Sequence, residues 1–158
     1  MEKRKELVES DSTQELTENE IKKEYLFEYR LHVRRIKRIE AEIEEIRAMK
    51  MHPSVISDGL PHGSRPSDLS SYASSLDGLE RELIQERYLR IKSYMDISRR
   101  IKQLKNEMER DVLFYRYIKG MDWWEIAERM GYCERHIHRY HGRALINLEI
   151  PKDVMECQ

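Results

Sequence analysis

The sequence predicts an all-α protein in which a long, coiled-coil-like antiparallel helical hairpin precedes a cluster of short helices. Two long segments repeat apolar residues at helical spacing, and a segment rich in proline and glycine separates them. Glycines then interrupt the C-terminal region at short intervals. Ala, Glu, Lys, Leu and Arg account for 70 of the 158 residues, which approaches the share of about half that is typical of long helices.

Charge and composition exclude several classes of protein. Lys and Arg total 29 and Asp and Glu total 30, so that the formal net charge is -1. Any binding of a polyanion must therefore come from a local patch rather than from the field of the whole chain. The two cysteines, Cys133 and Cys157, are too few for a disulfide framework. No run of 18 apolar residues occurs, and the N-terminus is too polar for a signal peptide, so we expect a cytoplasmic protein without membrane contact.

Residues 1–18 and 19–50 differ in pattern. The first 18 residues are charged and have no sustained apolar period, which predicts a flexible N-terminal arm. Residues 19–50 contain no Gly or Pro, and Asn19 could cap the start of a helix. The apolar stripe of this predicted helix advances by steps of three, four or seven residues and comprises Tyr25, Tyr29, Ile36, Ile39, Ile43, Ile46 and Met49.

Residues 51–66 predict a loop, because they hold three of the four prolines and two of the six glycines. A second helix is expected over residues 68–107. Its apolar stripe slips by an 11-residue step between Leu83 and Tyr94, which predicts a stutter. The stripe comprises Leu69, Tyr72, Leu76, Leu79, Leu83, Ile91, Tyr94, Ile97, Ile101, Leu104 and Met108. Residues 19–108 thus predict a hairpin, although the same stripes could instead join two copies of the chain.

Residues 109–150 predict three helices joined by tight turns, followed by a tail over residues 151–158. The first helix runs over 109–118 and ends at Gly120, and the second opens at Asp122, which forms a capping-box pair with Glu125. Gly131 makes the turn to a third helix over 134–147. Ala127 is small enough to lie at a steep helix crossing, so the register predicts a helix-turn-helix.

The third of these helices predicts a DNA-binding surface. Arg can donate two hydrogen bonds to guanine O6 and N7, and a helix fits the major groove. We therefore expect base contacts from Arg135, His136, His138 and Arg139, and contacts to the DNA backbone from Arg143, Lys119 and Trp124. Ile137, Ala144, Leu145 and Leu148 form the expected buried face.

Other chemistries have no support in the sequence. His136, His138 and His141 with Cys133 do not have the spacing of a zinc finger, so no metal is expected; His141 is expected to pack inside. Trp123 and Trp124 are adjacent and cannot both face inward. No P-loop, nucleophile elbow or dinucleotide fingerprint occurs, and we expect neither an enzyme nor a cofactor.

The chain also resembles known DNA-binding proteins. VLFYRY, EIAERMG and GRALINL are similar to region 4 of sigma-70-type RNA polymerase factors. PHGS at 61–64, SDLSSY at 67–72 and RHIHRYHGRAL at 135–145 resemble phage-encoded late-gene transcription regulators of the RinA and ArpU type. The resemblance spans about residues 20–148 and implies site-specific binding of phage promoter DNA in a bacterial host cell. Two positions depart from the pattern, because Cys133 replaces the usual Ser or Thr cap and Trp124 replaces a charged residue.

The expected partners are double-stranded DNA and RNA polymerase, together with a second copy of the chain that binds through the hairpin. Three alternatives stay open. A sigma-like factor that needs core polymerase is the least favoured, because the sequence lacks the additional promoter-reading region that such factors carry. A small terminase subunit of a phage also combines a helix-turn-helix with oligomerising helices, and it would form a ring. A coiled-coil adaptor that binds only protein would show no salt-dependent DNA binding.

Overall fold

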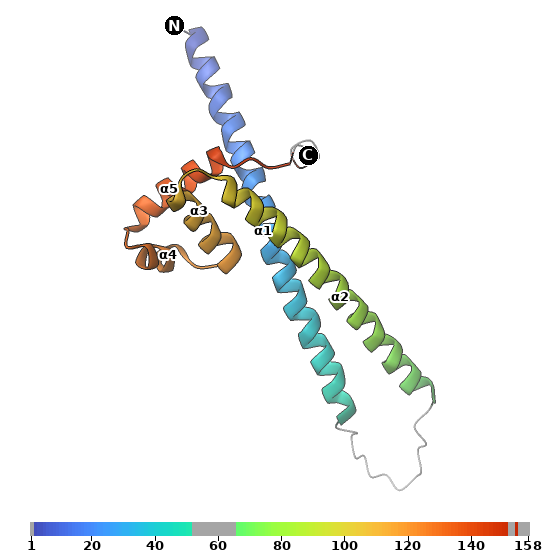
Figure 1. Cartoon of the computed structure of the whole chain (residues 1–158). Helices are drawn as coiled ribbons and strands as arrows, with labels where there is room; N and C mark the ends of the chain where they lie inside the picture. The colour runs from blue at the N-terminus through green and yellow to red at the C-terminus, as the bar shows by residue number, and fades with distance from the viewer. Residues whose placement is uncertain (1, 52–65, 152–153, 155–158) are drawn as a thin grey trace. The chain divides into compact units, whose positions relative to one another are not determined.

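The computed structural model describes residues 2–51, 66–151 and 154, with side chains described for residues 18–49, 70–151 and 154. The fold is all-helical, as predicted, and the described residues contain no strand. The elements are α1 (Glu2–Met51), α2 (Pro66–Gln103), α3 (Glu107–Leu113), the π-helix η1 (Phe114–Lys119), α4 (Trp123–Met130) and α5 (Glu134–Asn147) (Figure 1). The chain divides into two compact units. One comprises His32–Ile91, and the other comprises Met1–Leu31 together with Lys92–Gln158.

In the unit His32–Ile91, α1 and α2 run antiparallel along each other. Arg87 of α2 binds Glu40 of α1 at 2.8 Å, and about two turns further towards the loop Arg47 of α1 binds Glu80 of α2 at 3.0 Å. The predicted α1 stripe is confirmed at its centre, where three isoleucines are at most 5% exposed: Ile36, Ile39 and Ile43. Met49 is 66% exposed, so its predicted place in the stripe is wrong.

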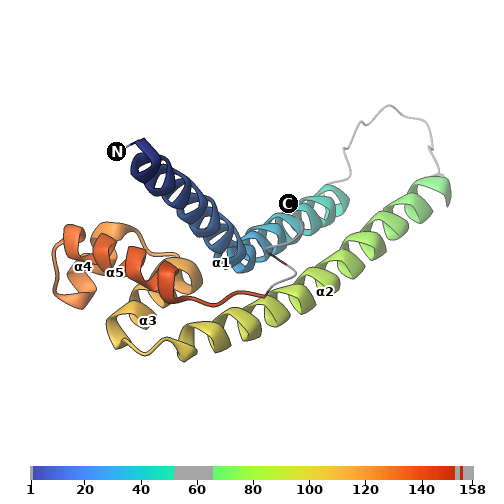
Figure 2. The same ribbon diagram turned by 90° about the horizontal axis from the view of Figure 1, so that it is seen from above.

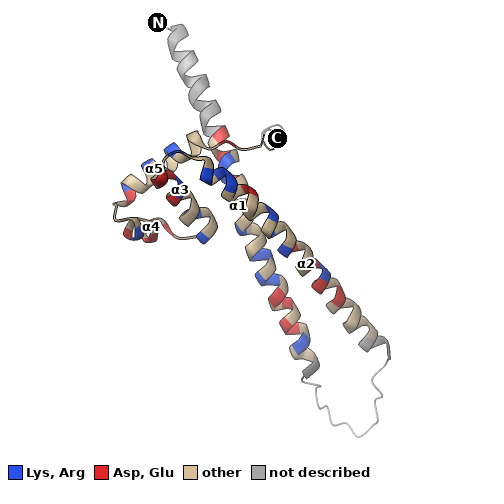
Figure 3. Ribbon diagram, in the orientation of Figure 1, with Lys and Arg blue, Asp and Glu red and all other residues tan. Residues whose placement is uncertain are grey.

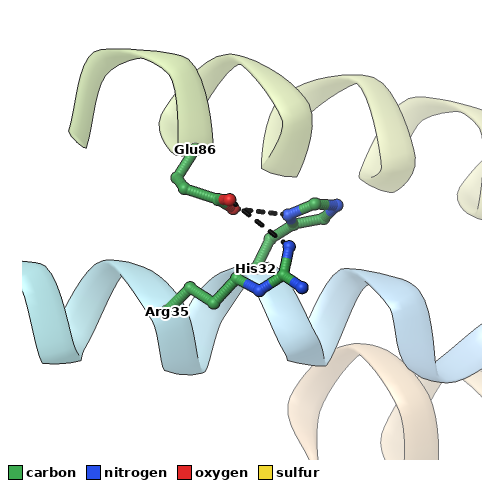
Figure 4. Close-up of polar contacts among 3 residues, drawn as sticks. All are labelled: His32, Arg35 and Glu86. Carbon is green, nitrogen blue, oxygen red and sulfur yellow. Dashed lines mark hydrogen bonds and ion pairs between the residues drawn. The ribbon is translucent and has the colours of Figure 1, made fainter. Parts of the chain in front are cut away.

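A buried polar layer crosses this hairpin (Figure 4). The Glu86 carboxylate lies 2.6 Å from His32 Nδ1 and 3.4 Å from an Arg35 guanidinium nitrogen. His32 and Glu86 are 5% and 9% exposed. Sliding either helix would leave the Glu86 carboxylate buried without these partners, so the layer favours one register of the hairpin.

The α2 stripe differs from the prediction. Ile91 is 54% exposed and Tyr94 is 40% exposed, whereas Glu86 and Ser93 are buried. The stutter expected between Leu83 and Tyr94 is therefore not part of the buried seam. The physical reason is that the Glu86 carboxylate has ion-pair partners on α1, which allows a polar residue to hold a position that apolar periodicity would not assign to it.

In the other unit, the start of α1 and the end of α2 pack with the C-terminal helices. Tyr25 donates a hydrogen bond to Asp96, and Arg100 pairs with the same carboxylate at 3.3 Å. The core of this unit comprises Tyr25, Leu26, Ile97, Ile101, Leu104, Leu113, Tyr117, Ile118, Ala144, Leu145 and Leu148.

Four predicted boundaries change. α2 begins at Pro66 rather than at residue 68, so Pro66 belongs to this helix and not to the predicted loop. α1 begins at Glu2 rather than at Asn19, so residues 2–18 share its helical backbone; their flexibility stays a prediction. α2 ends at Gln103 rather than near 107, because the Asn106 side chain accepts from the Met108 N–H at 2.9 Å and caps a new helix, α3. The helix predicted over 109–118 comprises α3 and η1.

Two predicted segments lie largely outside the described residues. The described ranges omit 52–65, where a loop was predicted, and most of the predicted tail over 151–158. Within the described ranges, no helix is both long enough and apolar enough to cross a bilayer.

Candidate functional site

Local capping fixes the three-helix segment from α3 to α5. Gly120 ends η1 and Gly131 ends α4, with φ angles of 73° and 72° that favour glycine. The Asp122 N–H donates to the Glu125 carboxylate at 2.7 Å in the capping box that opens α4. Both helix ends and the capping box confirm the sequence prediction, and α5 has the predicted bounds. Figure 2 shows α3, α4 and α5 close together in the unit that contains the C-terminal region of the chain.

A small apolar cluster holds α3, α4 and α5 together. Val112, Ile126 and Ile137 are fully buried, and Ala127 is 6% exposed among them. The Tyr132 N–H donates to the Ala127 carbonyl at 3.0 Å as the chain turns from α4 into α5. The predicted inward position of Ala127 is confirmed, and the short side chain leaves room for the neighbouring isoleucines.

The first two turns of α5 expose almost every side chain. Arg135, His136, His138 and Arg139 are all exposed, and only Ile137 between them is buried. The predicted inner residues of the helix end, Ala144, Leu145 and Leu148, are at most 2% exposed. Within the described part of the chain, Arg135 and Arg139 form no ion pair and no hydrogen bond. Two cations, four residues apart, therefore lie free on one face of this helix.

The two exposed histidines of α5 have neighbours within the module. The centroid of the His138 ring lies 4.5 Å from that of Trp123, and His136 Nδ1 lies 3.1 Å from the Cys133 sulfur. Cys133 is the N-cap residue of α5, and its side chain makes no capping hydrogen bond, which agrees with the weak acceptor strength of a thiol. The described residues contain no group of three His, Cys, Asp or Glu side chains that could hold a metal.

The three residues expected to contact the DNA backbone have different surroundings. Arg143 is exposed, but its guanidinium lies 3.9 Å from buried Glu109 and 4.8 Å from the Tyr140 ring centroid. Lys119, also exposed, lies over the Phe114 ring at 5.7 Å near the end of η1. Trp124 is 57% exposed in the first turn of α4. Lys119 and Trp124 thus flank the turn between η1 and α4, whereas Arg143 lies on α5.

A buried group of polar and aromatic side chains lies under α5. The Tyr117 hydroxyl is 2.8 Å from His141 Nε2, and burial lowers the pKa of His141 to about 4. His141 is therefore neutral near pH 7, and its Nε2 shares a hydrogen bond with the Tyr117 hydroxyl. The Arg116 guanidinium stacks over Trp123 at 4.5 Å and donates to the Met121 carbonyl at 2.9 Å.

These contacts confirm two expectations and add a residue that the sequence analysis missed. His141 packs inside, and Trp123 is the half-buried member of the tryptophan pair while Trp124 is exposed. Arg116 was not predicted to matter, yet its guanidinium joins η1 to the start of α4. The only sequence signal was its position near the two tryptophans, which does not distinguish a stacked arginine from a solvated one.

Comparison of the chain with protein-family models, curated proteins and solved structures finds no match.

Proposed function

We propose that residues 107–148 form a helix-turn-helix module that binds a specific duplex DNA site. The observation that carries this proposal is the exposed first half of α5, where Arg135 and Arg139 have no partner among the described residues. Recognition helices of this class place their N-terminal residues against base edges. The buried residues Ile137, Ala144 and Leu145 on the inner side of α5 hold that surface in place.

The chemistry of this surface suits direct readout of bases. Each arginine can donate two hydrogen bonds to one guanine in the major groove. His136 and His138 can add further donors or acceptors beside them. We assign Lys119, Trp124 and Arg143 to the DNA backbone, with the Arg143 contact in competition with its ion pair to Glu109.

The charge balance favours site-specific over purely electrostatic binding. Residues 111–150 hold six basic and six acidic side chains, so the module as a whole attracts phosphate weakly. Non-specific affinity rises with the number of phosphates that are neutralised. Useful binding by this chain must therefore depend on a few base contacts, supplemented by a second module or by a partner protein.

We further propose that the protein regulates transcription of phage or prophage late genes in the bacterial cytoplasm, with RNA polymerase as the protein partner. The support for this finer statement is the resemblance of its motifs to regulators of the RinA and ArpU type and to sigma region 4. A position of the gene beside phage packaging genes would support it further, and a position in an unrelated operon would count against it.

The direct test of DNA binding is selection of bound duplexes from a random pool at two salt concentrations. We expect one enriched motif and an affinity for it that falls as salt rises. Arg139→Ala should cost roughly 1–3 kcal/mol on the enriched motif and relax the preference at one base pair. Arg81→Ala, which removes the same charge from the hairpin where Arg81 pairs with Asp77, is the matched control and should leave binding unchanged.

Three outcomes of this experiment would contradict the proposal or part of it. An equal loss of affinity on every sequence would make Arg139 a phosphate contact only. Absence of any salt-dependent binding would favour a protein-binding adaptor. A ring-sized particle that binds one motif would favour a terminase-type subunit over a transcription regulator.

A further inference from the structure

Helix α2 carries a second apolar row that the hairpin does not bury. Ile84, Tyr88 and Ile91 are 67%, 61% and 54% exposed. Their spacing of four and three residues places them on one side of the helix. Leu79, Leu83 and Glu86, which are half-buried or buried, project from the opposite side. Large apolar residues that are exposed in a contiguous row mark an interaction surface far more often than scattered ones do.

The charges around this row are segregated along the hairpin. Towards the loop, residues 40–49 and 77–82 hold seven acidic and two basic side chains. Towards the other end, residues 32–38 and 86–91 hold six basic and one acidic side chain. Figure 3 shows the change from blue to red along α1 in this unit. The hairpin unit therefore has a negative end and a positive end, and the change from one to the other falls within the apolar row.

We propose that the row Ile84, Tyr88 and Ile91 binds the same row of a second copy of this chain, with the two α2 helices antiparallel. An antiparallel pair places the negative end of each hairpin against the positive end of its partner, at both ends of the contact. A parallel pair would place like charges together. The surface is thus complementary to itself under a two-fold axis, which is the property of an isologous dimer interface.

This contact differs from the one that the sequence predicts. The hairpin stripes were the expected dimer surface. The structure buries the centre of the α1 stripe within one chain and leaves Ile91, which was assigned to the α2 stripe, exposed. The sequence pattern does not reveal the second row, because Ile84 and Tyr88 lie close in sequence to Leu79 and Leu83 of the predicted α2 stripe. The inference deepens the proposed function, since a dimer would carry two recognition helices for two half-sites, but the dimer forms without DNA and is tested without it.

Sedimentation velocity of the full chain over a range of concentrations tests the proposal. We expect a species of twice the 19.2 kDa chain mass. Ile84→Lys and Ile91→Lys each place a lysine into the interface twice and should weaken the dimer on the order of tenfold or more. Ile146→Lys is the matched control, because Ile146 is an equally exposed apolar residue outside the hairpin unit, and it should leave the dimer intact.

Crosslinking tests the orientation of the two copies. With Cys133 and Cys157 replaced by serine, a cysteine is introduced as Gln85→Cys or as Asp77→Cys. In an antiparallel dimer centred near Tyr88, the two 77 positions are about 33 Å apart along the helix axis at 1.5 Å per residue, whereas the two 85 positions are close. A short thiol crosslinker should therefore join Gln85→Cys chains and fail to join Asp77→Cys chains.

Circular dichroism at the concentrations used establishes that each variant remains helical. A wild-type chain that is monomeric at its highest soluble concentration would overturn the proposal, as would lysine variants that dimerise like wild type. Efficient crosslinking of Asp77→Cys would overturn the antiparallel arrangement. None of these results bears on DNA binding by α5, so the failure of either proposal is recognisable by itself.

Discussion

Acidification should destabilise the C-terminal unit through one residue, His141. Its side chain is 7% exposed, its ring centroid lies 4.9 Å from that of Trp123, and its Nε2 shares a hydrogen bond with the Tyr117 hydroxyl. Burial lowers the pKa of His141 from 6.5 to about 4. A protonated imidazole would place an uncompensated charge in this site and would lose Nε2 as a hydrogen-bond acceptor.

The direction and size of the effect follow from proton linkage. Because the pKa is lower in the folded state, the unfolded chain takes up the proton first as the pH falls below 6.5. The stability that neutral His141 contributes is therefore fully present above pH 6.5 and is lost progressively down to about pH 4. The difference between the two pKa values corresponds to about 3 kcal/mol, of which about 2 kcal/mol disappears between pH 7 and pH 5.

Urea unfolding at pH 7 and at pH 5 measures this contribution. Wild type should lose about 2 kcal/mol more than His141→Gln between the two pH values, because glutamine does not titrate and its amide can still form a hydrogen bond with Tyr117. His136→Gln, which removes an exposed histidine of the same helix, should retain the wild-type dependence. An identical loss in wild type and His141→Gln would refute the assignment of a buried, neutral His141.

Two further predictions concern the packing of the same unit. Gly120→Ala should lower the melting temperature more than Gly131→Ala. Both positions have φ near +70°, a backbone conformation that costs alanine about 1 kcal/mol. Only at Gly120 would the added Cβ also collide with the Arg30 guanidinium. Equal shifts would show that Arg30 moves aside freely. Ala127→Leu should cost roughly 1–3 kcal/mol by overpacking the contact with Val112 and Ile137, and an unchanged melting temperature would contradict the close helix crossing.

The parts of the fold that local chemistry determines were predictable from the sequence. Gly120 and Gly131 end helices because their positive φ angles favour glycine, and the Asp122–Glu125 capping box requires only neighbouring residues. The bounds of α5 and the burial of Ile137, Ala144 and Leu145 follow from those caps and from the helical period. The exposure of Arg135 and Arg139 follows from the same register.

The features that depend on distant partners were not predictable. Glu86 is buried because His32 and Arg35 on another helix bind it, and no periodicity assigns a glutamate to a seam. Asn106 ends α2 early by capping α3, although the apolar stripe continues through that point. The ion pair of Arg143 with Glu109 joins residues that are 34 positions apart. The sequence pattern does not reveal such a contact, so Arg143 was assigned to the DNA backbone alone.

Whether α5 reads base edges is decided by the affinity of the full chain for the enriched duplex and for a scrambled duplex at one fixed salt concentration. We expect a clear preference for the enriched duplex, which falls when Arg135 or Arg139 is replaced by alanine and persists in Arg81→Ala. Equal affinity for the two duplexes, or a preference that survives the loss of both α5 arginines, would contradict the claim that α5 reads base edges.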